Sequence, residues 1–146
     1  MRYLLILLIH LLLVNLLFVF KAESRGYSRT KFEKSYRFIE NRQYDSALFS
    51  INELLNSLKE NNEIGEAYFS LGFTYNEIGK PLKAIQYYLK AADYYTESSC
   101  LSNTFENIGL IYKGFNQHDY AVYYFSKAIN LESERSIRMM KKLYSR

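Results

Sequence analysis

The chain has 146 residues, of which 17% are aromatic, with 15 Tyr, 10 Phe and no Trp. A single proline and six glycines, set against so many large apolar residues, exclude a disordered chain and predict a mostly helical, well-packed one. The formal net charge of +4 is mild and its basic residues are interspersed with acidic ones, which excludes a typical nucleic-acid-binding protein.

The first 24 residues differ in composition from everything after them. A nearly continuous apolar run covers 4–20, and small residues precede a cleavage position after Ser24. This layout is typical of a secretory signal peptide, whose removal would leave an extracytoplasmic (periplasmic or secreted) protein. The alternative is a retained membrane anchor that contacts the bilayer through 4–20. Lys21 and further basic residues follow the run and disfavour export by the positive-inside rule, so both interpretations stay open.

After this segment, apolar and small residues recur at the spacing of amphipathic helices. The pattern predicts helices at 28–41, 44–60, 63–78, 81–97, 101–115 and 118–132. The breaks within each pair of helices are only two or three residues long, so we expect antiparallel helix hairpins. Pro81 stands in the first turn of its predicted helix, where the missing N–H has no cost.

The helices repeat with a fixed period. Ala47, Ala84 and Ala121 are 37 residues apart, and Gly72 and Gly109 share this interval. Such a period indicates a solenoid of stacked helix pairs. Because a glycine inside a helix costs about 1 kcal/mol relative to alanine, we expect these glycines to allow a close approach of the second helix, which presents the alanines.

The segments AYFSLGFTYNEIGKPLKAIQYYLKA (67–91) and TFENIGLIYKGFNQHDYAVYYFSKA (104–128) resemble the tetratricopeptide repeat. Both have an aromatic residue, then Leu or Ile with Gly, then Tyr on the first helix, and Ala, an aromatic residue and Ala on the second. The resemblance implies an all-α fold: a right-handed superhelical array of antiparallel helix pairs, or α-solenoid. We expect three repeats at 28–61, 65–98 and 102–135. The 37-residue period departs from the usual length of about 34 residues and is similar to repeats of bacterial sensory and regulatory proteins.

The segment 136–146 is basic and has apolar residues on one helical face. Because stacked repeats need a terminal helix to cover the last apolar surface, we expect a C-terminal capping helix. The alternative is a basic amphipathic helix that lies on a membrane or meets a partner helix.

Residues for catalysis or metal binding are sparse. His10 lies in the apolar leader and His118 in a predicted turn, and the single cysteine, Cys100, has no histidine near it in sequence. The chain has no glycine-rich phosphate loop and no Gly-x-Ser-x-Gly motif. We therefore expect no enzyme, no cofactor and no metal site.

The first helices of tetratricopeptide repeats line a concave surface, and the resemblance places nine residues there. These are Phe32, Tyr36, Phe69, Phe73, Asn76, Asn103, Glu106, Leu110 and Lys113. Four aromatic rings in a groove would favour an apolar or aromatic peptide anchor, whereas the same rings would also suit packing between helices.

Chaperone-binding members of this family hold a peptide's terminal carboxylate with Lys, Arg and Asn side chains. The corresponding positions carry Phe32, Tyr36, Ser70, Asn103 and Asn107, which disfavours that mode. We predict an exported or membrane-anchored scaffold that binds a protein or peptide on the concave surface. The alternative is a sensory input module, whole or truncated, of a bacterial signal-transduction protein, which the anchor-like leader and the long repeat spacing suggest.

Overall fold

The structure is a computed structural model that describes residues 31–131 and 134–144. The predicted leader, 1–24, lies outside the described residues. The chain divides into two compact units, Met1–Lys34 and Ser35–Arg146, and the helices from Tyr44 onward belong to the second.

All regular secondary structure in the described part of the chain is helical, as predicted. Residues 31–40 form a helix. The helices that follow are α2 (Tyr44–Leu55), α3 (Asn61–Glu77), α4 (Pro81–Tyr94), α5 (Ser98–Gly114), α6 (His118–Ile129) and α7 (Glu134–Tyr144).

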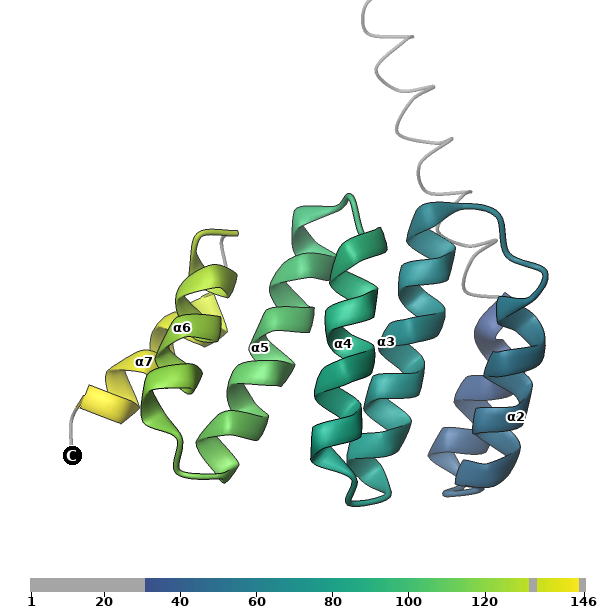
Figure 1. The fold of residues 1–146 in the computed structure, drawn as a ribbon, viewed down its shortest axis with the longest axis horizontal. Coiled ribbons are helices and arrows are strands. Elements are labelled where there is room, and N and C mark those ends of the chain that lie inside the picture. The colour runs from purple at the N-terminus through teal and green to yellow at the C-terminus, as the bar shows by residue number, and fades with distance from the viewer. Residues whose placement is uncertain (1–30, 132–133, 145–146) are drawn as a thin grey trace, which may run out of the picture. The chain divides into compact units, whose positions relative to one another are not determined.

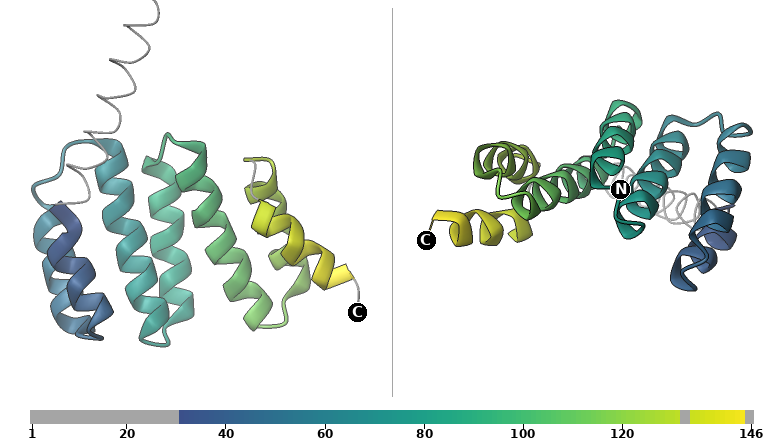
Figure 2. Two further views of the ribbon diagram at one scale, coloured as in Figure 1. Left: turned by 180° about the vertical axis from the view of Figure 1, so that it is seen from behind. Right: turned by 60° about the horizontal axis from the view of Figure 1, so that its bottom comes forward.

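Within the second unit, each helix packs against the next one in the chain. The closest partners are α3 with α4 and α5 with α6, while α4 contacts α5 and α7 contacts α6. The left view of Figure 2, which is seen from behind, shows α7, in yellow, in front of α6. The predicted all-α solenoid of stacked antiparallel helix pairs is thereby confirmed.

The tight turns inside the pairs lie at the predicted breaks and share one geometry. Arg42, Gly79 and Asn116 each have a positive φ, of 57°, 78° and 59°. Beside Gly79, the Lys80 N–H donates to the Tyr75 carbonyl over 2.9 Å, and the other two turns have the equivalent bond. This is the Schellman type of helix end, in which a left-handed residue lets the chain reverse while the last carbonyls stay bonded.

Three predicted helix ends were wrong, and one of them is that of the helix predicted over 118–132, which ends at Ile129. The helix predicted over 44–60 ends at Leu55, because the Ser57 hydroxyl and N–H both donate to the Leu54 carbonyl, over 2.7 and 2.9 Å. These bonds occupy the carbonyl of the last turn and close the helix early.

The helix predicted over 81–97 ends at Tyr94. The N–H and the hydroxyl of Thr96 instead donate to the Asn62 side-chain oxygen, over 3.0 and 3.1 Å. The side chain of Asn62 thus holds the junction between the pairs in an extended turn, and α5 begins at Ser98, three residues earlier than predicted.

The core contains the small residues at the predicted positions. Ala47, Ala84 and Ala121 all have an exposed fraction of 0%. The glycines, however, do not face the alanines directly. A Cβ on Gly72 would lie 2.8 Å from the Tyr88 ring, and a Cβ on Gly109 would lie 2.7 Å from the Phe125 ring. The glycines therefore make room for an aromatic ring of the second helix.

Candidate functional site

The nine predicted surface residues do not form one surface. Phe32 and Glu106 have exposed fractions of only 0% and 4%, so neither presents a side chain to a partner. Glu106 is buried where α5 meets α7, and the Ser136 hydroxyl of α7 donates to its carboxylate over 3.4 Å. The prediction that Phe32 and Glu106 contact a partner was therefore wrong, because both side chains are buried.

Two further residues have packing roles. The centroid of the Phe69 ring lies 5.3 Å from that of the Tyr88 ring of α4. Tyr88 belongs to the apolar core between α4 and α5, and Phe69 packs against this core. The Tyr36 hydroxyl donates to the Glu66 carboxylate of α3. These contacts favour the alternative that the sequence left open, in which such rings pack between helices.

Glu66 connects two tyrosines from different helices. Its other carboxylate oxygen accepts a bond from the Tyr95 hydroxyl over 2.7 Å, just after the end of α4. Burial, and then the neighbouring Glu66 charge, raises the pKa of Tyr95 far above its usual value. The carboxylate thus ties the helix over 31–40 and α4 to α3.

The remaining predicted residues are accessible. Phe73 is 37% exposed, Asn76 and Asn103 are exposed, and Leu110 is half-buried. Lys113 is half-buried, with its ammonium group 3.9 Å from the Met139 sulfur of α7.

Asn76 and Leu110 come together at a hollow between α3, α4 and α5. Its volume is about 350 Å³. The lining residues are Asn76, Pro81, Tyr88, Asn107, Leu110, Ile111, Gly114 and Phe115. Of these residues, the sequence analysis predicted only Asn76 and Leu110 as part of a binding surface. The four from α5 are spaced i, i+3, i+4 and i+7, so the sequence would have placed them on one helical face: Asn107, Leu110, Ile111 and Gly114.

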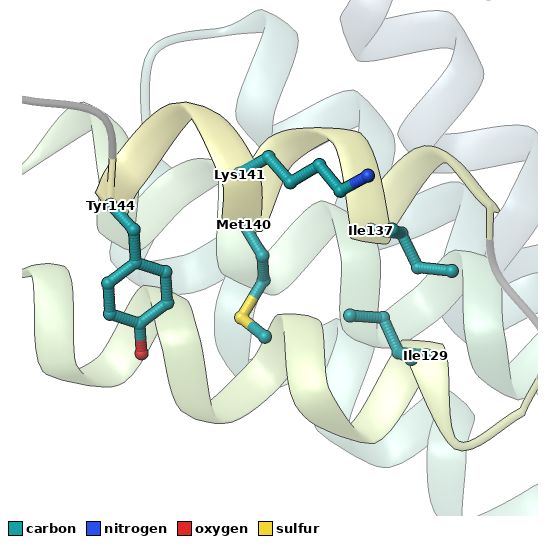
Figure 3. Close-up of a pocket in the computed structure, with 5 residues that line it drawn as sticks. All are labelled: Ile129, Ile137, Met140, Lys141 and Tyr144. Carbon is teal, nitrogen blue, oxygen red and sulfur yellow. The ribbon is translucent and has the colours of Figure 1, made fainter.

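A second hollow of about 430 Å³ lies between α6 and α7. Figure 3 shows Ile137, Met140 and Tyr144 of α7 pointing toward α6, with Ile129 facing them and Lys141 beside them. Ile137 is 39% exposed, so part of this apolar face stays uncovered. Whether α7 acts as a cap stays a prediction.

The described residues contain no group of three His, Cys, Asp or Glu side chains that could hold a metal ion. Cys100, the single cysteine of the chain, is half-buried, and His118 is exposed at the start of α6. In the same part of the chain, none of the helices combines the length and the apolar character that crossing a bilayer requires.

One family model matches this sequence, that of the tetratricopeptide repeat, over residues 65–97. No curated protein sequence matches the chain. Because the match covers one repeat, the 37-residue period stays a prediction.

Solved structures show the same fold at low identity. MamA is 24% identical, with a TM-score of 0.62, over 75% of this chain and 60% of that one. The TPR2AB domain of yeast Sti1, in a complex with pHSP90, is 16% identical, with a TM-score of 0.71, over 82% of this chain and 47% of that one. The TPR domain of Arabidopsis FLU is 23% identical, with a TM-score of 0.59, over 73% of this chain and 94% of that one. This chain therefore spans less than two thirds of the first two structures. It carries a tetratricopeptide repeat at residues 65–97 and has the tetratricopeptide-repeat fold.

Proposed function

We propose that the protein is an interaction scaffold that binds a peptide or a peptide segment of a protein partner. The observation that carries this proposal is the hollow between α3, α4 and α5, where amide and apolar side chains converge. A concave site with an apolar lining and few polar groups is the usual form of a binding site. The Sti1 domain in its complex with pHSP90 supports this use of the fold.

The lining suits a peptide in two ways. Asn76 and Asn107 can each donate and accept hydrogen bonds, which matches the needs of a peptide backbone. Leu110 and Phe115 provide an apolar contact for a side chain, and Phe115 is 39% exposed.

Among the described residues that line this hollow, none is Lys or Arg. A terminal carboxylate would find no cationic partner there. The proposed ligand is therefore an internal or amide-bonded segment with at least one apolar side chain.

The test begins with short displayed peptides selected on the full chain. Affinity of the selected peptide is then measured for the natural chain, for Leu110→Ala/Phe115→Ala, and for the control Leu82→Ala/Leu89→Ala. The control residues are also exposed apolar side chains, at 69% and 39%, but they lie outside the hollow.

We expect the hollow variant to bind about tenfold more weakly or worse, and the control to bind within about twofold. Helical circular dichroism should be equal in all three proteins. Equal affinity of the natural chain and the hollow variant would exclude this site. Phe69→Ala is unsuitable for the test, because Phe69 packs on Tyr88 and its loss would destabilise the fold.

We also propose that residues 1–24 export the protein or anchor it in a membrane, on the composition of that segment. Mass spectrometry of the N-terminus separates the two. A chain that begins at Arg25 indicates cleavage, and an intact leader in the membrane fraction indicates an anchor. An intact leader in the soluble fraction would contradict both.

A further inference from the structure

Helices α4 and α6 share a pattern of lysine and tyrosine on one side, which we call the lysine–tyrosine face. It consists of Lys83, Tyr87 and Lys90 on α4, and of Tyr120, Tyr124 and Lys127 on α6. In each helix the three residues are spaced i, i+4 and i+7, so they lie on one face. None of them lines the hollow of the proposed function.

On α4 the lysines lie over stacked rings. The rings of Tyr75 and Tyr87 are 5.2 Å apart and nearly parallel, at 7°. The Lys83 ammonium lies 4.3 Å from the Tyr75 centroid. The Lys90 ammonium lies 5.4 Å from the Tyr87 centroid and 5.6 Å from the Tyr68 centroid. Both lysines thus make cation–π contacts.

The same arrangement recurs on α6. The rings of Tyr112 and Tyr124 are 5.5 Å apart and again at 7°. The Lys127 ammonium lies 5.0 Å from the centroids of both Phe105 and Tyr123. The positions of Tyr87 and Lys90 correspond to those of Tyr124 and Lys127 one repeat later.

The lysines of this face have positive charge available for a partner. Lys83, Lys90 and Lys127 are exposed, and within 31–131 and 134–144 the contacts recorded for them are to tyrosine and phenylalanine rings rather than to carboxylates. At about 100° per residue, Asp119 falls outside the face, and Asp93, three residues after Lys90, lies at its edge. The ring contacts also restrain the lysine side chains, which lowers the entropy lost when an anion binds.

We propose that the lysine–tyrosine face binds an acidic segment of a partner protein. Carboxylates of the segment pair with the three lysines, and its apolar side chains lie against Tyr120 and Tyr123, which are 57% and 53% exposed. Lys83 and Lys90, on one face of α4, suit a short run of Asp or Glu, and Lys127 on α6 suits a further acidic residue of the same segment. A nucleic acid would call for a more basic surface than a chain of net charge +4 provides.

The test measures binding of the full chain to a fluorescent peptide by anisotropy. The probe is Glu-Glu-Leu-Glu-Glu-Tyr repeated twice, and a matched probe has Gln in place of every Glu. Two variants remove the same charge: Lys83→Gln/Lys90→Gln/Lys127→Gln on the face, and Lys59→Gln/Lys141→Gln/Lys142→Gln at exposed positions elsewhere.

We expect the natural chain to bind the Glu probe and not the Gln probe. The face variant should lose about tenfold in affinity, or about 1.4 kcal/mol shared among three exposed ion pairs. The control variant should stay within about twofold. Leu110→Ala/Phe115→Ala should bind the Glu probe normally, which separates this proposal from the function proposed for the hollow.

Equal loss in the two lysine variants would overturn the proposal, since only net charge would then matter. Failure of the natural chain to bind the Glu probe would overturn it as well. Vesicles of anionic phospholipid provide a further arm of the experiment. If the face variant loses vesicle binding while the peptide does not bind, the face recognises a membrane surface and the proposal of a protein partner is wrong.

Discussion

At the scale of single residues, two glycines decide how closely the helices of a pair approach. Gly72 and Gly109 each face an aromatic ring of the second helix, and those rings, on Tyr88 and Phe125, are at most 1% exposed. A methyl group at either glycine would lie closer to the ring than carbon atoms normally come. Close packing therefore offsets the low helix propensity of glycine.

We predict that Gly109→Ala lowers the free energy of unfolding by about 1 kcal/mol. Overpacking against Phe125 costs about 1–3 kcal/mol, and the higher helix propensity of alanine returns up to about 1 kcal/mol. Urea denaturation followed by circular dichroism measures the change.

Gly114→Ala is the matched control. Gly114 ends the same helix, and a Cβ there meets no atom within 4 Å. This variant should be as stable as the natural chain or more stable by up to about 1 kcal/mol. If both variants had the same stability, the ring contact of Gly109 would have no energetic role.

At the scale of helices, the Glu66 carboxylate connects three elements. It accepts hydrogen bonds from Tyr36, in the helix over 31–40, and from Tyr95, after α4. Gly65, its neighbour in α3, faces the Tyr95 ring, which a Cβ would approach to 2.8 Å. The Tyr95 ring is thus held by close packing and its hydroxyl by a charged acceptor.

We predict that Tyr95→Phe lowers the free energy of unfolding by about 1.5 kcal/mol. Hydrogen bonds to charged groups contribute about 1.5–3 kcal/mol, and Glu66 keeps its second partner in this variant. Thermal and urea denaturation measure the loss.

Tyr94→Phe serves as the control, because the Tyr94 ring packs on Tyr68 at 5.5 Å and its hydroxyl has no hydrogen bond to the described residues. It should change stability by no more than about 0.5 kcal/mol. In Glu66→Gln the effect of Tyr95→Phe should shrink. An unchanged effect would mean that the bond between Tyr95 and Glu66 does not stabilise the fold.

The helix pairs could be predicted because their signals are local. Alanines at a constant interval and the short breaks near Gly79 and Asn116 lie within the pairs themselves. The helix ends at Leu55 and Tyr94 were missed, because Ser57 and Asn62 form bonds that no periodic pattern reveals.

The candidate surface was harder to predict, because exposure depends on neighbouring helices. Glu106 looks like a surface residue in sequence and is buried by α7. Phe69 has the same chemistry as Phe73, and only the position of Tyr88 distinguishes a packed ring from an exposed one. The lysine–tyrosine face was not predicted from the sequence, although Lys90 and Lys127 are separated by the same 37 residues as the alanines.

At the scale of the whole molecule, the second unit presents two surfaces with different chemistry. The hollow between α3, α4 and α5 has amide and apolar side chains, whereas the lysine–tyrosine face is cationic and aromatic. The two surfaces share no residue. One scaffold could therefore hold two segments of a partner, and a segment pair joined by a short linker would gain affinity from the second contact.

At this scale we also expect stability to depend on pH through two buried tyrosines. Burial is the main cause that raises the pKa of both Tyr88 and Tyr95, with Glu77 and Glu66 adding negative charge nearby. In the unfolded chain these groups ionise near pH 10. Because the folded state holds its protons more tightly, this contribution to stability is fully present below pH 10 and is lost as the pH rises further.

We predict that the free energy of unfolding falls by up to about 1.4 kcal/mol per pH unit for each of these two groups above pH 10. Urea titrations at pH 9, 10 and 11 measure the slope, and absorbance of tyrosinate shows whether ionisation accompanies unfolding. Tyr88→Phe/Tyr95→Phe should flatten the slope although it lowers stability at neutral pH. Tyr120→Phe, at a side chain that is 57% exposed, should leave the slope unchanged. An equal slope in the natural chain and the double variant would show that other groups cause the alkaline loss of stability.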